Sequence, residues 1–224
     1  MSLVVTRGLT WPRAKVDAIG VQPRLFSGER VSQVLIVLLF SAMAVRIGRD
    51  VALTHHVTGL LLLASEGLVV VFTMIRRPAG IVDRTINGRI LTIFATFAPQ
   101  FVRPGSMHPL APDSFTVLLS ASGLILVVLA KLSLGRSFGL VPANRGVVST
   151  GLYRFLRHPI YMGYLLTHVG FAIANPTGWN FFILVSADVT LLLRAIREER
   201  TLAVDPEYFA YMQRVRWRLV PGLF

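Results

Sequence analysis

The sequence predicts an all-α fold: a polytopic membrane helix bundle with about six transmembrane spans. Its residues are 54% hydrophobic and only 15% charged, whereas soluble proteins carry roughly 25% charged residues. Apolar runs of near-membrane length recur along the 224 residues, and positive charge gathers in alternate connections between them. These observations indicate that lipid is the solvent for most of the chain.

Six apolar runs are long enough, or nearly so, to cross the hydrocarbon core as helices. They cover residues 31–47, 57–75, 86–102, 114–131, 159–174 and 178–193. The third run is the weakest because it contains Asn87, Arg89 and Pro99. The last two runs are separated only by the Asn-Pro-Thr sequence at 175–177, which predicts a tight turn and a short C-terminal helical hairpin.

Six spans would place both termini on one side of the membrane, and the basic residues indicate which side. Twenty of the 23 Lys and Arg residues lie with the termini, and only Arg46, Arg49 and Arg103 lie opposite. The positive-inside rule assigns the arginine-rich side to the cytoplasm. A soluble chain with a net charge of +12 would suggest a nucleic-acid partner. Here topology explains the charge, and we expect no nucleic-acid binding.

The residue inventory excludes several kinds of chemistry. The chain has no cysteine, which removes disulfides, thiolate metal sites and a cysteine nucleophile. No P-loop, dinucleotide-binding, HExxH or GxSxG motif occurs in the sequence. We expect no metal site, since His55, His56 and His108 fall on the opposite side of the predicted membrane from His158.

A polar and aromatic stripe begins the fifth span. His158, Tyr161, Tyr164 and His168 recur at helical spacing, and Pro159 suits a first helical position. Such a stripe is costly against lipid, so it must face protein, water or a ligand. Residue chemistry alone leaves two interpretations open: a membrane-interface belt that anchors the helix end, or a functional site.

A second polar cluster ends the sixth span. Arg194 and Glu198 are four residues apart and share a helix face, while Glu199 points roughly 100° away. The cluster could be a solvated helix end with intrahelical ion pairs. It could equally hold a cationic or hydroxyl-rich ligand, and the residues alone do not decide between the two.

Two acidic residues fall inside apolar runs, where a lone carboxylate costs several kcal/mol. Asp188 is expected to reach His168 across the hairpin, whereas Glu66 has no obvious partner. Structural hydrogen bonding is the favoured interpretation. The alternative is a transporter or channel that uses Glu66, Asp188 and His168.

The C-terminal part of the sequence carries a specific combination of motifs. A Gly-rich loop is followed by GLYRFLRHPIYMGY, the short hairpin, and REERTLAVDPEYFAYMQRVRWRLVP. Over about the last ninety residues the chain resembles the isoprenylcysteine carboxyl methyltransferase superfamily, which includes the phospholipid methyltransferases. The resemblance implies an enzyme that transfers a methyl group from S-adenosylmethionine to a lipophilic acceptor. It also implies a cytoplasmic cofactor pocket.

The resemblance assigns site residues by position. The implied cofactor-binding residues are Arg145, Gly146, Val147, Val148, Tyr153, His158, Pro159, Ile160, Tyr161 and Glu198. Among them, His158 and Tyr161 would hold the methionine end of the cofactor, and Glu198 the nucleoside side. The implied catalytic residues are Arg157 and Arg194, facing the acceptor, and Glu199, which is the alternative to Glu198.

The sequence and the resemblance together divide the chain into three predicted parts, and they suggest an acceptor. Residues 1–30 would form a cytoplasmic interfacial arm, 31–132 peripheral transmembrane helices, and 133–224 the methyltransferase core. The paired arginines favour carboxyl methylation of an isoprenoid-type substrate. Amine methylation of a phospholipid headgroup is the alternative, and an inactive scaffold remains a further one.

Overall fold

The computed structural model describes residues 26–79, 81–83, 85–104 and 108–224. Its α-helices are α2 Phe26–Thr54, α3 Val57–Ile75, α4 Ile86–Phe97, α5 Asp113–Leu134, α6 Pro159–Ala174, α7 Gly178–Leu202 and α8 Pro206–Arg214. The expected interfacial arm at 1–30 lies outside the described residues, apart from the start of α2. The all-α prediction is confirmed.

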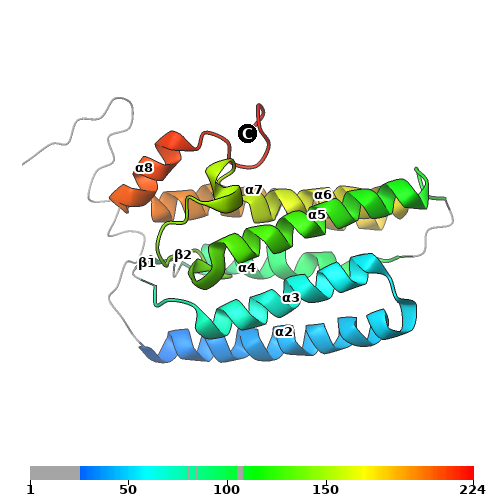
Figure 1. Cartoon of the computed structure of the whole chain (residues 1–224), viewed down its shortest axis with the longest axis horizontal. Helices are drawn as coiled ribbons and strands as arrows, with labels where there is room; N and C mark the ends of the chain where they lie inside the picture. Colours follow the sequence, from blue (N-terminus) through cyan, green and yellow to red (C-terminus); the bar gives the residue numbers. More distant parts are fainter. Residues whose placement is uncertain (1–25, 80, 84, 105–107) are drawn as a thin grey trace, which may run out of the picture.

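Helices α2 to α7 lie side by side and alternate in direction (Figure 1). The end of α3, the end of α5, the start of α6 and the end of α7 therefore meet at one end of the bundle, next to α8. Among the described residues, four helices are long and apolar enough to cross a membrane. They cover Arg30–Leu53, Val57–Ile75, Asp113–Ser137 and Gly178–Leu202. The protein is therefore an integral, multi-pass membrane protein.

The other two predicted spans are shorter than expected. The run 86–102 divides into α4, of 12 residues, and a 3₁₀ helix, η1 (Ala98–Phe101). Pro99, which has no backbone N–H to donate, lies in η1 and is compatible with this change. Helix α6 has 16 residues and is apolar but falls below the length of a full span.

Helix starts follow the capping residues in the sequence. Thr177 accepts a hydrogen bond from the backbone N–H of Asn180 and begins α7 directly after the predicted turn. Asp205 caps α8 in the same way through Glu207, with Pro206 at the first helical position. Pro159 occupies that position in α6, as expected.

Helices α5 and α6 approach closely through glycines. A Cβ added to Gly163 would lie 2.6 Å from the carbonyl oxygen of Gly123, and one added to Gly170 would lie 2.4 Å from Ser120 Oγ. Small residues allow such contact between membrane helices, where packing rather than hydrophobicity drives association. The contact fixes α6, which carries the His158–Tyr161 motif at its start.

We expect Gly163→Ala to destabilise the protein by about 1–3 kcal/mol, because the added methyl group collides with backbone and forces the helices apart. Thermal unfolding in detergent measures this loss. Gly67→Ala is the matched control, since Gly67 also lies within a helix and has no atom within 4 Å of the added Cβ. There the better helix propensity of alanine should stabilise slightly. Equal shifts in both variants would contradict the packing argument.

Both intramembrane carboxylates have partners. The expected contact between His168 and Asp188 is confirmed, with 2.6 Å between Nδ1 and Oδ1. The expectation that Glu66 lacks a partner is wrong. Lys131 Nζ lies 3.8 Å from Glu66 Oε1 and donates to the Ser65 hydroxyl at 2.8 Å. These pairs account for both acids as structural groups.

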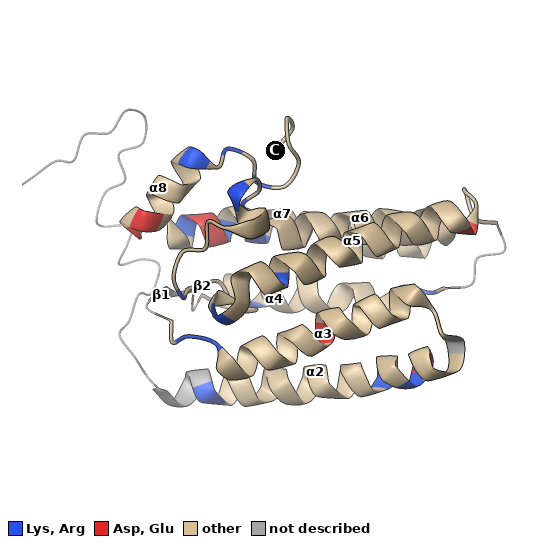
Figure 2. Ribbon diagram, viewed as in Figure 1, with Lys and Arg blue, Asp and Glu red and all other residues tan. Residues whose placement is uncertain are grey.

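Charge is unevenly distributed along the bundle (Figure 2). Among the described residues, the end that carries α8 holds most of the basic side chains, and Arg46 and Arg49 lie near the far end of α2. Arg7, Arg13, Lys15, Arg24 and Arg84 lie outside the described residues. The bundle therefore has one strongly basic end, as the sequence predicts.

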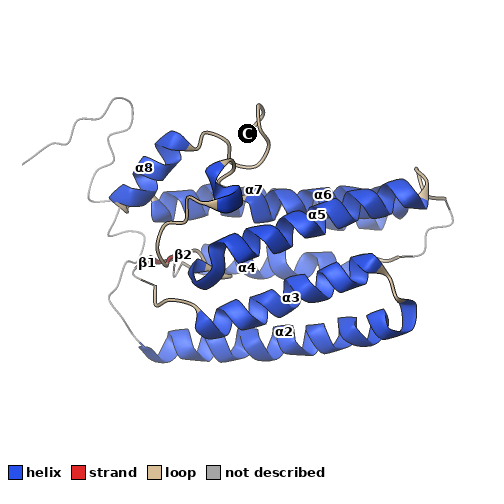
Figure 3. Cartoon of the chain, in the orientation of Figure 1, coloured by secondary structure: helices blue, strands red, loops and turns tan. Residues whose placement is uncertain are grey.

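Two short strands, which hydropathy does not predict, join distant connections at the basic end (Figure 3). They are β1 (Ile81–Val82) and β2 (Ala143–Asn144). They pair antiparallel, with Ile81 opposite Asn144 and Val82 opposite Ala143. The pairing brings the α3–α4 connection against the loop that precedes α6.

Candidate active site

A cavity lies at the basic end, bounded by the loop before α6, the start of α6, the end of α7 and α8. The structure brings most of the sequence-predicted site residues together around it. Those that line the cavity are Arg145, Gly146, Val147, Val148, Tyr153, Arg157, His158, Ile160, Tyr161, Arg194 and Glu198. Pro159 and Glu199 do not line it.

Every tyrosine of the chain lines this cavity. The five are Tyr153, Tyr161, Tyr164, Tyr208 and Tyr211. Burial, together with the nearby carboxylates, raises the pKa of Tyr153 and Tyr208 far above the ordinary value, and burial does the same for Tyr211. These hydroxyls stay protonated at neutral pH. The cavity therefore has walls of neutral aromatic rings, whose faces attract cations.

The polar side of the cavity is formed by His158 and Tyr161, at the start of α6, and by Glu198 of α7. The Tyr161 hydroxyl donates to Glu198 Oε2 at 2.7 Å. The rings of His158 and Tyr161 are stacked, with centroids 5.2 Å apart and planes 5° from parallel. Oε1 of Glu198 accepts no hydrogen bond from the residues that the structure describes, so it is available to a hydroxyl or amine donor.

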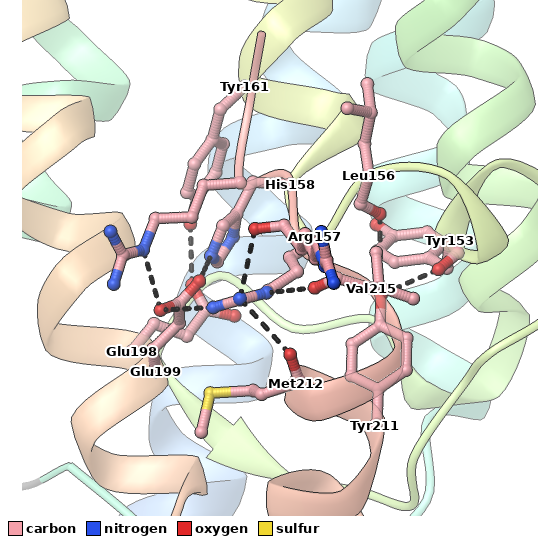
Figure 4. A network of polar contacts seen from close by, with 12 residues as sticks. Tyr153, Leu156, Arg157, His158, Tyr161, Glu198, Glu199, Tyr211, Met212 and Val215 are labelled. Atoms are coloured by element: carbon pink, nitrogen blue, oxygen red, sulfur yellow. Dashed lines mark hydrogen bonds and ion pairs between the residues drawn. The ribbon is translucent and has the colours of Figure 1, made fainter. Parts of the chain in front are cut away.

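Glu199 is the centre of a separate buried network (Figure 4). Its Oε2 accepts from Arg157 Nη1 at 3.0 Å and from Arg218 Nε at 2.8 Å, and its Oε1 lies 3.2 Å from His158 Nε2. The residue is only 4% exposed. Glu199 thus joins α7 to the start of α6 and to the C-terminal segment. It lies beside the cavity and has a structural role there.

Arg157 uses all three of its guanidinium nitrogens within the protein. Besides Glu199, it donates to the carbonyl oxygens of Val215 at 2.6 Å, Met212 at 3.2 Å and Arg216 at 3.1 Å. Its backbone N–H also donates to Trp217 O at 3.0 Å. Arg157 therefore ties the C-terminal segment to the cavity wall, and each of its three guanidinium nitrogens already donates within the protein.

Arg194 has a different environment. Its side chain is buried, with 7% of the residue exposed, and its guanidinium carbon lies 5.4 Å from the centre of the Tyr161 ring. Nη2 donates to the Leu140 carbonyl. Nε has no hydrogen-bond partner among the described residues. An unsatisfied buried donor in a cavity wall is costly and suits an anionic ligand.

The loop before α6 is held by its own polar side chains. Asn144 Oδ1 accepts from the backbone N–H of Gly146 at 3.0 Å, and the Ser137 hydroxyl donates to Arg145 O at 3.1 Å. Gly146 has φ +98°, a conformation that side chains rarely adopt, so this position requires glycine. The loop can therefore bring backbone close to a ligand in the cavity.

Several lining residues escaped the sequence-based assignment. Tyr208 and Tyr211 of α8 line the cavity, and the Tyr211 hydroxyl donates to Tyr153 O at 2.8 Å. Their spacing of three residues in the C-terminal motif places both on one helix face, which was the available signal. Leu140 and Phe138 lie in a loop without periodicity, so no pattern predicts their place.

The residues present fit S-adenosylmethionine. Tyrosine faces suit its sulfonium cation, the available oxygen of Glu198 suits hydroxyl or ammonium groups, and the glycine loop admits close backbone contact.

Comparison with known proteins agrees with the site. Residues 114–204 match the phospholipid methyltransferase family, from the first turn of α5 to just beyond α7. No curated protein matches the chain by sequence. Members of the matched family use S-adenosylmethionine to methylate lipids. Residues 114–204 therefore form a phospholipid methyltransferase family domain, and the chain is an S-adenosylmethionine-dependent membrane methyltransferase with a lipid acceptor.

Proposed function

We propose that the enzyme methylates the carboxylate of an isoprenoid-type lipid. The observation that carries the proposal is the buried, partly unsatisfied guanidinium of Arg194 in the cavity wall. The lining contains three arginines, Arg145, Arg157 and Arg194, but only one carboxylate, that of Glu198. Glu199 offsets Arg157. The remaining excess of positive charge favours an anionic acceptor over an ammonium headgroup.

For the cofactor we propose the binding roles that the family resemblance implies, and the lining of the cavity is compatible with them. His158 and Tyr161 would hold the methionine end, Glu198 the nucleoside side, and the 145–148 loop with Tyr153 the remaining wall. When bound, S-adenosylmethionine supplies an electrophilic methyl group on a sulfonium. Stacking between His158 and Tyr161 and the Tyr161–Glu198 hydrogen bond preorganise these groups before the ligand arrives.

Arg194 would hold the acceptor carboxylate. A carboxylate is already ionised at neutral pH, so the protein needs to orient it rather than to remove a proton. The guanidinium can do so through Nε while Nη2 stays on the Leu140 carbonyl. The surrounding tyrosine rings exclude water from the reacting groups.

We also propose that six helices cross the membrane, with the site and both termini on the cytoplasmic side. The alternating directions of α2 to α7 support six crossings (Figure 1). Helix α6, with 16 residues, spans about 24 Å, which a locally thinned bilayer accommodates. The basic end carries the cavity, and the positive-inside rule places that end in the cytoplasm.

Amine methylation of a phospholipid headgroup is the second candidate, favoured by the description of the matched family. An ammonium acceptor must lose a proton before it can attack, and Glu198 or His158 would have to accept it. The His158 ring is already bonded to Glu199, whereas Glu198 keeps one carboxylate oxygen open to an ammonium group. The excess of arginine in the cavity lining makes this candidate the weaker one.

A transfer assay separates the two candidates. The full chain is reconstituted in phosphatidylcholine vesicles with methyl-labelled cofactor, and an S-prenylcysteine carboxylate and phosphatidylethanolamine are supplied in parallel. We expect label in the prenyl product, released as methanol by mild alkali because the product is a methyl ester. Alkali-stable label in the phospholipid fraction would establish amine methylation instead. Absence of label in both fractions would overturn both acceptor classes.

A further inference from the structure

The connection between α3 and α4 lies outside the matched family domain, yet it reaches the cofactor side of the cavity. Its described residues are 76–79, 81–83 and 85, and we call them the α3–α4 segment. The match begins at residue 114. Besides the β1–β2 pairing, Asp83 N donates to Pro142 O at 3.0 Å and Arg77 N donates to Arg136 O at 2.8 Å. We call residues 135–150, in the connection between α5 and α6, the cofactor loop. The α3–α4 segment thus contacts this loop at residue 136 and at residues 142–144.

One contact reaches a cavity-lining side chain directly. Arg145 is buried and lines the cavity, and its Nη1 donates to the backbone carbonyl of Arg77. Arg77 therefore helps to fix where the Arg145 guanidinium lies. A Cβ added to Gly146 would also lie 3.2 Å from Arg77 Nη1, so the α3–α4 segment and the cofactor loop are in close contact there.

Asp83 anchors the segment to α7. The side chain is almost completely buried, with 2% of the residue exposed, and its Oδ2 lies 2.9 Å from Arg197 Nε. Oδ1 accepts from the Thr85 hydroxyl at 2.6 Å and from the Thr85 backbone N–H at 3.0 Å. Arg197 also donates to the Thr85 hydroxyl. Because Arg197 precedes Glu198, the anchor holds the helical turn that presents Glu198 to the cavity.

We propose that the α3–α4 segment is a positioning element for the cofactor site, with Asp83 as its anchor. It acts from two directions, through Arg145 in the cofactor loop and through the α7 turn that carries Glu198. The proposal rests on the cofactor placement given under the proposed function. Side chains that are held rigidly before binding raise the affinity for a ligand, because they lose less conformational entropy when the ligand binds.

The charge state of Asp83 suits a permanent anchor. Burial by itself would raise the pKa of this carboxyl, but the hydrogen bonds from Thr85 and the ion pair with Arg197 hold it below the ordinary value. Asp83 therefore stays ionised across the neutral range, and the contact with Arg197 persists with it.

The test is titration of the full chain in detergent with S-adenosylhomocysteine. We expect Asp83→Asn to weaken binding about tenfold and to raise the KM for the methyl donor similarly, with kcat at saturation changed less than about twofold. Arg197→Lys keeps the charge but loses the fork that reaches both Asp83 and Thr85. It should give a smaller loss, and it tests the same contact if Asp83→Asn fails to fold.

Asn180→Ala is the matched control. Asn180 is fully buried at the opposite end of the bundle, where its side chain bonds to the backbone of Arg103 at 2.9 Å. It should lower thermal stability without weakening the binding of S-adenosylhomocysteine. Unchanged binding in Asp83→Asn and Arg197→Lys, or equal weakening in Asn180→Ala, would overturn the positioning role. A wild-type protein that does not bind this ligand would overturn the cofactor placement as well, whereas the acceptor assay tests the proposed acceptor separately.

Discussion

Glu199→Gln is expected to lower the free energy of unfolding by about 3–5 kcal/mol, because it leaves buried hydrogen-bond donors, among them the Arg157 guanidinium, without their carboxylate. Most of this loss comes from Arg157 and His158, whose contacts with Glu199 are buried. The Arg218 contact adds little, since that side chain is 37% exposed and water screens it. Thermal unfolding in detergent measures the change.

The same substitution should also loosen the C-terminal segment, which Glu199 holds through Arg218 and, indirectly, through Arg157. Trypsin is therefore expected to cleave after Arg214, Arg216 and Arg218 faster than in the wild type. Glu198→Gln is the control one residue away. It should unfold near the wild-type temperature yet bind S-adenosylhomocysteine more weakly. Equal destabilisation by both substitutions would contradict the architectural role of Glu199.

Hydropathy located the helices well but not their ends. Five of the six predicted apolar runs each fall within one described α-helix, because lipid contact requires apolar side chains and satisfied backbone groups. The run 86–102 instead divides into α4 and η1. Helix α7 continues to Leu202, beyond the predicted end at 193, since a helix does not stop where its apolar run does. That extension carries Arg194, Glu198 and Glu199, so the site is built on a rigid helix rather than on a frayed end.

Local spacing explains much of the site. His158 and Tyr161 stack as neighbours three residues apart, and Pro159 begins the helix that presents them. Spacing also predicted that Glu198 and Glu199 point in different directions, and the structure gives each a separate set of contacts. The sequence could not say which carboxylate faces the cavity, because that depends on how α7 rotates against α6.

The contacts that the sequence missed are those between distant parts of the chain. Lys131 reaches Ser65 and Glu66 from 66 and 65 residues away, and Arg197 reaches Asp83 from 114 residues away. No periodicity within a helix encodes such pairs; they follow from which helices become neighbours. For the same reason, the sequence does not predict the contact between the α3–α4 segment and the cofactor loop, which the pairing of β1 with β2 creates.

Arg194→Gln is expected to reduce kcat/KM for the acceptor by about 10²–10³, a loss comparable to removing one preorganised donor from a reacting centre. Glutamine is shorter and uncharged, so it can neither hold a carboxylate nor remain over the Tyr161 ring as a cation. Binding of S-adenosylhomocysteine should change less than about threefold, since the assigned cofactor contacts lie on other residues. Steady-state kinetics with varied acceptor, together with ligand titration, measures both quantities.

Arg194→Lys distinguishes charge from geometry. Lysine keeps the positive charge but lacks the planar fork that can hold the Leu140 carbonyl and an acceptor carboxylate together. It should recover part of the activity lost in Arg194→Gln, mainly through a lower KM for the acceptor. An ammonium acceptor reverses the expectation, because removing Arg194 would then relieve repulsion and leave the acceptor KM unchanged or lower. The two substitutions therefore test the anionic nature of the acceptor through the buried Arg194 guanidinium in the cavity wall.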